Sequence, residues 1–123
     1  MKSQESAENY LETILLLQRK QGYVRATDIA ESLQYTKASI SRAVKLLKEK
    51  GYLYQDAHKM IFLTPKGEEK AVQIYERHQF FVVFLTEVLQ LDPQIAEQDA
   101  CRMEHVVSDS TFQGFQQLYE KMK

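Results

Sequence analysis

Apolar residues recur at helical spacing in the first stretch of the chain. From Ser3 to Gln21 they form one stripe, and Gly22 follows as a left-handed C-cap, so this range is predicted to be a helix. Leu15 and Leu16 widen the stripe, so the helix is expected to bury more than one side. The stripe consists of Ala7, Tyr10, Leu11, Ile14 and Leu17.

The range from Val24 to Gly51 predicts two helices joined by a tight turn. Residues 28–33 form a short amphipathic segment, residues 34–35 form the turn, and Thr36 is a good N-cap for the next helix. That second helix separates its residues into two faces. The face toward the core carries Ile40, Ala43, Val44 and Leu47, and the opposite face carries Ala38, Ser41, Arg42 and Lys45.

Two short β segments follow, at residues 52–54 and 60–63. Their aromatic and β-branched residues bracket a polar loop, which is typical of a hairpin. A hairpin that follows a helix–turn–helix is a wing, and Lys59 at its tip is placed to contact DNA phosphates.

The C-terminal half predicts three more helices. Thr64 and Pro65 begin a long helix that runs to about Gln90, since Thr caps and Pro suits the first helical position. By the same chemistry Asp92 and Pro93 begin a helix that ends near Val107. A third helix, capped by residues 108–110, ends near residue 122.

The predicted fold is therefore mostly α, with an N-terminal winged helix–turn–helix that has a two-stranded wing and a C-terminal helical dimerisation region. We expect a boundary within the long helix, giving a DNA-binding domain at residues 1–75 and a metal-binding and dimerisation domain at residues 76–123. Every residue from Phe80 to Leu85 is apolar, so these side chains surround the helix and cannot all face a single core. This run predicts a second subunit, and hence a homodimer.

Charge is distributed unevenly over the 123 residues. The net charge is −1, but residues 24–66 contain eight basic and four acidic residues, so this segment carries +4 and the remainder −5. A basic segment in an acidic chain indicates a polyanionic partner for that segment. The single cysteine excludes an internal disulfide, and there is neither a secretory signal nor an apolar run of membrane-spanning length. We therefore expect a cytoplasmic protein with no membrane partner.

The polar face of the second short helix suits the major groove of double-stranded DNA. Small residues let the backbone approach the bases, arginine can read guanine bidentately, and a helix N-terminus attracts phosphate. The alternative is an ordinary solvated face. The predicted DNA-binding residues are Arg25, Thr36, Lys37, Ala38, Ser39, Ser41, Arg42, Lys45 and Lys59.

Candidate metal ligands lie in the next-to-last helix. Cys101, Glu104 and His105 are spaced i, i+3 and i+4, which puts a thiolate, a carboxylate and an imidazole on one helix face. His78 falls within an apolar stripe, where an imidazole needs a polar partner or a metal. The alternative is an exposed face with an incidental cysteine.

Six segments together resemble the diphtheria toxin repressor family of metal-dependent regulators, which includes the manganese transport regulators. The motifs cover nearly the whole chain in the family's order, and the last is especially specific. They are Glu8-Asn9-Tyr10-Leu11-Glu12, Thr27-Asp28-Ile29-Ala30-Glu31, Ser39-Ile40-Ser41-Arg42-Ala43-Val44-Lys45-Leu46-Leu47, Leu63-Thr64-Pro65-Lys66-Gly67, Glu76-Arg77-His78, and Asp99-Ala100-Cys101-Arg102-Met103-Glu104-His105-Val106-Val107-Ser108.

The resemblance implies a metal site between a winged helix–turn–helix and a helical dimerisation region, with Fe²⁺ or Mn²⁺ as the cofactor. Cys101 resembles the iron-responsive branch, Glu12 resembles the manganese branch, and Asn9 departs from the residues usual in both. Val82 replaces an acid that some iron regulators use in an extra site, for which Glu97 is a candidate substitute. The implied ligands are Asn9, Glu12, His78, Cys101, Glu104 and His105.

The expected function is that of a dimeric repressor of metal-uptake genes, activated by metal and bound to a palindromic operator. An alternative is a winged-helix regulator switched by redox chemistry or a small ligand. A metalloenzyme using Glu104 as general base is disfavoured, because the chain has only four glycines and neither a phosphate-binding loop nor a nucleophile motif. We therefore do not expect an enzyme.

Overall fold

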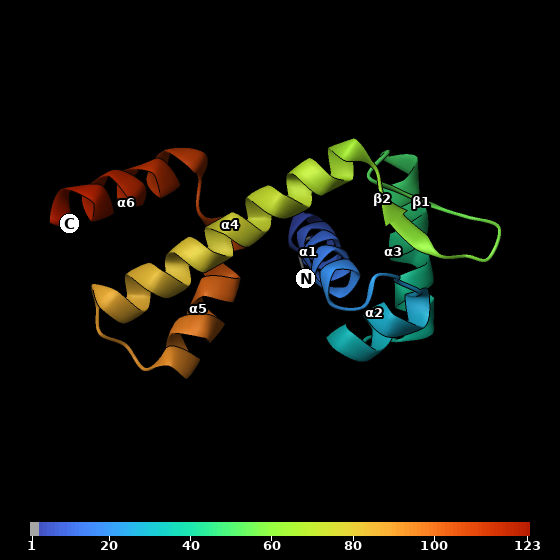
Figure 1. Cartoon of the computed structure of the whole chain (residues 1–123), viewed down its shortest axis with the longest axis horizontal. Helices are drawn as coiled ribbons and strands as arrows, with labels where there is room; N and C mark the ends of the chain where they lie inside the picture. The colour runs from blue at the N-terminus through green and yellow to red at the C-terminus, as the bar shows by residue number, and fades with distance from the viewer. Residues whose placement is uncertain (1–2) are drawn as a thin grey trace. The chain divides into compact units, whose positions relative to one another are not determined.

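The computed structural model describes residues 3–123, and the side chains of the first helix from Ala7 onward. It confirms a mostly α fold with a winged helix–turn–helix (Figure 1). The chain divides into two compact units, residues 1–73 and 74–123. The elements are α1 (Ser3–Gln21), α2 (Ala26–Leu33), α3 (Lys37–Glu49), β1 (Leu53–Gln55), β2 (Ile61–Leu63), α4 (Pro65–Glu87), α5 (Pro93–Val106) and α6 (Asp109–Met122).

In the N-terminal unit, α2 and α3 form the helix–turn–helix. Helix α2 begins two residues earlier than predicted, because the Asp28 carboxylate accepts a hydrogen bond of 2.8 Å from the backbone N–H of Arg25 and so caps the helix there. Gln34 makes the turn with φ 58°. As predicted, Thr36 caps α3 by accepting a bond of 3.1 Å from the backbone N–H of Ser39.

The core of this unit joins α1 to the helix–turn–helix and the wing. Leu15 is buried as expected, but Leu16 is 39% exposed, so the stripe on α1 is narrower than predicted. Burial of these apolar side chains is the main term that holds the unit together. The buried residues are Tyr10, Leu11, Ile14, Leu15, Val24, Ile29, Ile40, Val44, Leu47, Leu53 and Ile61.

The wing is an antiparallel pair of β1 and β2, with Leu53 opposite Leu63 and Gln55 opposite Ile61. Both strands begin one residue later than predicted. Tyr52 lies outside β1 because its backbone N–H donates to the carbonyl oxygen of Leu47 in the last turns of α3. The carboxylate of Asp56 accepts from two backbone N–H groups of the loop and closes the tip of the wing.

The C-terminal unit has a shorter long helix than the sequence suggested. Helix α4 ends at Glu87, because Gln90 has a left-handed φ of 56° and the backbone N–H of Leu91 donates to Leu85. Leu89, which the prediction placed within this helix, therefore lies beyond its end and is 54% exposed. The predicted starts of α5 and α6 are confirmed, capped by Asp92 and Ser108.

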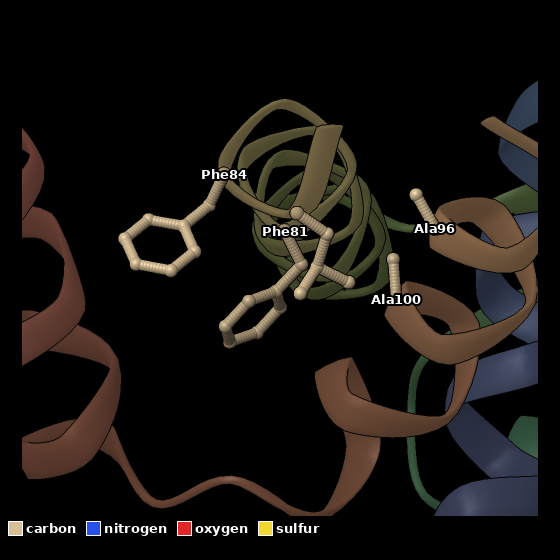
Figure 2. Close-up of a cluster of buried hydrophobic side chains, with 5 residues drawn as sticks. Phe81, Phe84, Ala96 and Ala100 are labelled. Carbon is tan, nitrogen blue, oxygen red and sulfur yellow. The ribbon is translucent and has the colours of Figure 1, made fainter. Parts of the chain in front are cut away.

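An apolar cluster packs α4 against α5 and α6, and Figure 2 shows its buried members. Phe81 of α4 is fully buried, and the small side chains of Ala96 and Ala100 on α5 are buried with it. Phe112 and Phe115 of α6 meet Phe81 edge-on at centroid distances of 5.5 and 5.7 Å. These contacts hold α4 and α5 in the register on which the site described next depends.

Two large apolar residues of α5 lie outside the core. Ile95 is 50% exposed and Val106 is 60% exposed. The narrow face of α5 that packs inward is the one lined by alanines, because close approach of α4 leaves no room there for larger side chains.

Candidate metal centre and nucleic-acid interface

Helix α5 brings Cys101, Glu104 and His105 together as the spacing predicted. One ligand atom from each side chain lies within 4.8 Å of the other two. The side chain of Glu104 is fully buried, whereas Cys101 is exposed. A buried carboxylate beside a thiol and an imidazole is an expensive arrangement that calls for positive charge nearby.

Part of that positive charge comes from His78 of α4. Its Nδ1 lies 2.9 Å from Oε2 of Glu104, and Nε2 of His105 lies 3.2 Å from Oε1 of the same carboxylate. Glu104 thus lies between two imidazoles. The structure therefore brings four of the six predicted ligands together within the C-terminal unit.

The pKa of His78 is raised to about 9, chiefly by the hydrogen bond to the Glu104 carboxylate. Burial of the ring acts in the opposite direction, and the charges of Glu104 and Glu97 add to the increase. At neutral pH the ring therefore carries a proton on both nitrogens. The expectation that His78 has polar partners inside its apolar stripe is confirmed.

The donor set fits a divalent transition metal. Two donor atoms that lie about 2.0–2.3 Å from one ion are separated by at most about 4.6 Å. The ligand atoms of Cys101, Glu104 and His105 all lie within 4.8 Å of one another, so small adjustments bring them to one ion. Thiolate, imidazole and carboxylate together suit Fe²⁺ and its neighbours better than Mg²⁺ or Ca²⁺, which prefer oxygen alone. The residues present therefore fit a metal.

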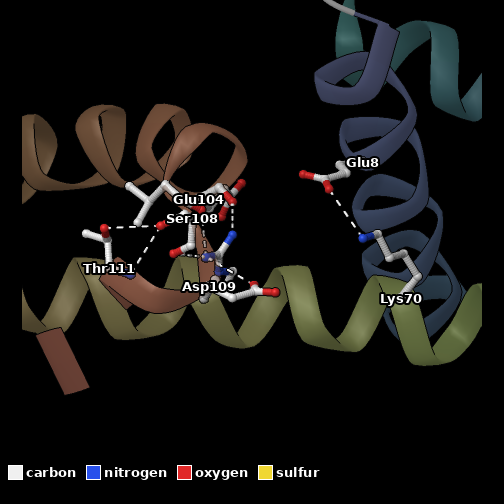
Figure 3. A network of polar contacts seen from close by, with 8 residues as sticks. Glu8, Lys70, Glu104, Ser108, Asp109 and Thr111 are labelled. Atoms are coloured by element: carbon white, nitrogen blue, oxygen red, sulfur yellow. Dashed lines mark hydrogen bonds and ion pairs between the residues drawn. The ribbon is translucent and has the colours of Figure 1, made fainter. Parts of the chain in front are cut away.

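Asn9 and Glu12 belong to the N-terminal unit, where they lie one turn apart on α1. Asn9 is half-buried. Glu8, the residue before Asn9, is buried and pairs with Lys70 of α4 at 3.5 Å, as Figure 3 shows. The part of Asn9 and Glu12 in metal binding stays a prediction.

Sequence reasoning missed Arg77, whose side chain fixes the end of α5. Its guanidinium donates to the backbone carbonyl oxygens of Glu104 at 3.0 Å, Val107 at 2.8 Å and Ser108 at 3.1 Å. It also lies over the ring of Phe112, 4.7 Å from the centroid. Figure 3 labels Glu104 and Ser108, two of the residues whose carbonyl oxygens accept these bonds. The only signal in the sequence was an arginine directly before His78.

The predicted DNA-binding residues all lie on the N-terminal unit, at α3, at the start of α2 and at the wing. Eight of the nine are exposed, and Ser39 is half-buried because it takes part in the cap of α3. Lys59 lies at the wing tip with φ 64°. Four of the nine line one groove between α3 and the wing: Arg25, Ser41, Lys45 and Lys59.

That groove has a volume of about 500 Å³ and carries basic residues that the prediction omitted. Lys48 follows Ser41 and Lys45 at i+7 and i+3, so the spacing on α3 was available as a signal. Its Nζ donates to Oε1 of Gln55 at 3.0 Å, and Nε2 of Gln55 donates to the Lys59 carbonyl at 3.1 Å. The first bond ties α3 to the wing, and the second lies within the wing, between β1 and the loop. His58 also lines the groove.

Comparison with known proteins gives matches along nearly the whole chain. The profile "Iron dependent repressor, N-terminal DNA binding domain" matches residues 2–59, and "Iron dependent repressor, metal binding and dimerisation domain" matches residues 64–123. None of the described helices combines the length and the apolar character needed to cross a membrane.

Individual relatives agree with these profiles. The chain is 35% identical over 117 residues to the transcriptional regulator MntR of Escherichia coli O157:H7, covering 95% of this chain and 75% of that one. It is 32% identical over 120 residues to a helix–turn–helix regulator of Methanocaldococcus jannaschii, covering 97% and 96%. The structure of the manganese regulator SloR matches with 26% identity and a TM-score of 0.82, covering 98% of this chain and 55% of that one. The chain thus spans about half the length of that solved protein.

Proposed function

The chain belongs to the diphtheria toxin repressor family of metal-dependent transcriptional regulators, and we propose on this premise that it is a homodimeric repressor activated by Fe²⁺ or Mn²⁺. The observation that carries the proposal is the cluster of Cys101, Glu104 and His105, in which the carboxylate of Glu104 is fully buried. The same chain contains a winged helix–turn–helix with a basic groove, which would bind the DNA.

We propose that His78, Cys101, Glu104 and His105 hold the metal, with Asn9 and Glu12 added from the resemblance to the family. When bound, a divalent cation supplies the positive charge that lets a thiolate and carboxylates share one site. Asn9 adds a neutral oxygen to this anionic set and so avoids a further repulsion. In this role the Glu104 carboxylate, which contacts His78 in the structure, would be one of the groups that hold the cation.

On DNA, α3 is the recognition helix. Ala38 and Ser41 let its backbone approach the base edges, Arg42 reads a base, and Lys45 contacts phosphate. Lys59 of the wing contacts phosphate in the neighbouring groove. A symmetric dimer presents two such helices, so the operator is a palindrome with half-sites one helical turn or a multiple apart. The site of action is the cytoplasm, where Cys101 stays reduced.

Metal sensing in this proposal is a shift of population between two states of the dimer. The cation must bind the DNA-competent state more tightly than the other state, because equal affinity for both shifts nothing. The coupling is reciprocal: the factor by which bound metal increases the affinity for DNA equals the factor by which bound DNA increases the affinity for metal.

A test begins with selecting duplexes from a random library on the Mn²⁺-loaded protein. The Kd for a selected duplex is then measured with Mn²⁺, with anaerobic Fe²⁺ and with a chelator. We expect the metal to tighten binding at least about tenfold, which corresponds to about 1.4 kcal/mol of coupling. Glu104→Gln should remove this response, and Glu120→Gln, a distant exposed acid, should keep it.

The alternative mechanism has its own signature in the same assay. If the chelator has no effect and binding instead follows oxidation of the exposed thiol of Cys101, the regulator is a redox switch and the metal proposal is wrong. Cys101→Ser would then abolish the response to oxidant.

A further inference from the structure

His78 lies between two carboxylates of the same helix. Its Nδ1 is 2.9 Å from Oε2 of Glu104, and its Nε2 is 2.7 Å from Oε1 of Glu97. Glu97 and Glu104 are seven residues apart on α5, so both project from one face of that helix. Each nitrogen of the ring therefore contacts a carboxylate.

The two carboxylates differ in environment. Glu104 is fully buried, whereas the Glu97 side chain is 60% exposed. Glu104 belongs with Cys101 and His105 to a group of ligand atoms close enough for one ion, and among the described residues no such group includes Glu97. Glu97 therefore contacts the ring from outside the cluster.

An imidazole that binds a metal through one nitrogen usually donates its other N–H to a carboxylate, which fixes the tautomer and the ring orientation. We propose that Glu97 is a positioning residue: it holds the proton on Nε2 of His78 and thereby directs Nδ1 to the metal. This inference rests on the proposed function, because it assigns His78 as a ligand. It gives Glu97 a role different from that of a ligand in an extra site.

The proposal also explains why an exposed residue makes so short a contact. Without Glu97, rotation about the last bond of the His78 side chain exchanges the sides to which the two nitrogens point. The Glu97 carboxylate favours the orientation in which Nε2 points to solvent and Nδ1 to Glu104. A rotated ring would present the wrong edge to the cluster.

The test uses the full chain in four forms: wild type, Glu97→Ala, Glu97→Gln and Glu120→Ala. Mn²⁺ affinity is measured by titration, and the tautomer of His78 is measured by nitrogen NMR of the imidazoles in the Zn²⁺-loaded protein. His78→Gln identifies the signal. Glu120 is the matched control, since its side chain is also an exposed carboxylate of the C-terminal unit, 71% exposed.

We expect Glu97→Ala to weaken Mn²⁺ binding about tenfold and to abolish the single Nε2–H tautomer of His78. Glu97→Gln retains an acceptor oxygen, so it should keep that tautomer and an affinity within about threefold of wild type. Glu120→Ala should match wild type in both measurements.

Other results would overturn the inference in separate ways. Wild type that binds neither Mn²⁺ nor Zn²⁺ refutes the proposed function and the inference with it. Wild-type binding with an unchanged affinity and tautomer in Glu97→Ala refutes the inference alone. A loss of one bound ion per chain in Glu97→Ala and in Glu97→Gln would make Glu97 a ligand.

Discussion

The carboxylate of Glu104 is fully buried and lies 2.9 Å from Nδ1 of His78, in a contact between α5 and α4. Because a buried carboxylate needs compensation, this pair holds a proton in the absence of metal. If His78 is a metal ligand, as proposed, a cation at Nδ1 would have to displace that proton. The proposed function therefore predicts that the ion pair and the metal compete for the same two side chains, and that metal binding depends on pH.

The first prediction concerns the stability of the metal-free protein. The pKa of His78 is raised from 6.5 to about 9, so the ion pair contributes stability that is fully present below pH 6.5 and is lost as pH rises through 9. The contribution is at most about 3 kcal/mol, and solvent near the exposed Glu97 reduces it. Urea unfolding with chelator at pH 6, 7.5 and 9.5 measures this loss.

Glu104→Gln is the matched variant for this measurement, since it removes the charge at nearly constant volume. We expect its stability to change much less between pH 6.5 and 9 than that of wild type. A wild-type stability that is flat across this interval would show that His78 has an ordinary pKa.

The second prediction compares two helical glycines. A Cβ built on Gly67 would overlap the carbonyl oxygen of Tyr52, where the start of α4 packs beside the wing. Gly67→Ala must push the two apart and should cost about 2–4 kcal/mol. Gly114 in α6 has no atom within 4 Å of its Cβ position, so Gly114→Ala should stabilise the protein by about 0.5–1 kcal/mol.

Thermal and urea unfolding of the two variants decide the matter. Equal effects of the two substitutions would mean that the contact between α4 and the wing is loose. A stabilised Gly67→Ala would contradict the packing of α4 against Tyr52 outright.

The local parts of this structure were accessible from sequence. Capping by Thr36, Asp92 and Ser108 involves atoms two or three residues away, so the side chain alone marks the start of each helix. The cluster of Cys101 and Glu104 is equally local, because one turn of helix sets its spacing.

Contacts between residues distant in the chain could not be predicted in this way. The bonds from Arg77 reach residues 27 to 31 positions away, and Glu97 is 19 positions from His78. No periodicity encodes which of several acids meets a given imidazole, since that depends on how α4 and α5 pack. The exposure of Leu89 follows likewise from where α4 ends.

The third prediction concerns Arg77. Arg77→Ala removes three hydrogen bonds to backbone carbonyls at the end of α5 and should destabilise the protein by about 2–4 kcal/mol. Arg77→Lys should recover only part of this, because an ammonium group lacks the planar fork of a guanidinium. Arg102→Ala is the control, since Arg102 is an exposed arginine of α5.

Chemical denaturation with chelator present separates this effect from metal binding. If Arg77→Ala and Arg102→Ala unfold at the same urea concentration, the Arg77 network contributes nothing to stability. Full recovery by Arg77→Lys would show that only the charge matters.

The fourth prediction separates base reading from phosphate contact on α3. Arg42→Ala should cost about 1–3 kcal/mol of operator binding and relax the preference at one base pair. Lys45→Ala should weaken all duplexes alike and reduce the salt dependence of binding by about one counterion. Both side chains are exposed, so neither variant disturbs the core.

Binding to the selected duplex and to a random duplex, each at several salt concentrations, tests both statements. An equal loss on the two duplexes for Arg42→Ala would rule out base reading by Arg42.

The last prediction concerns the choice of metal. A thiolate is a soft ligand that favours Fe²⁺ over Mn²⁺, whereas a serine hydroxyl is neutral and hard. Cys101→Ser should therefore weaken Fe²⁺ binding at least about tenfold and Mn²⁺ binding much less. Anaerobic titration of the full chain with each metal gives the two affinities.

Asn9→Asp supplies the complementary change, if Asn9 is a ligand as proposed. A hard, charged oxygen in place of a neutral amide should strengthen Mn²⁺ binding more than Fe²⁺ binding, because Mn²⁺ depends more on charged oxygen ligands. The double variant should then select Mn²⁺ over Fe²⁺ more strongly than either single one. Identical affinities of wild type, Asn9→Ala and Asn9→Asp for both metals would place Asn9 outside the site, and the selectivity would rest with Cys101.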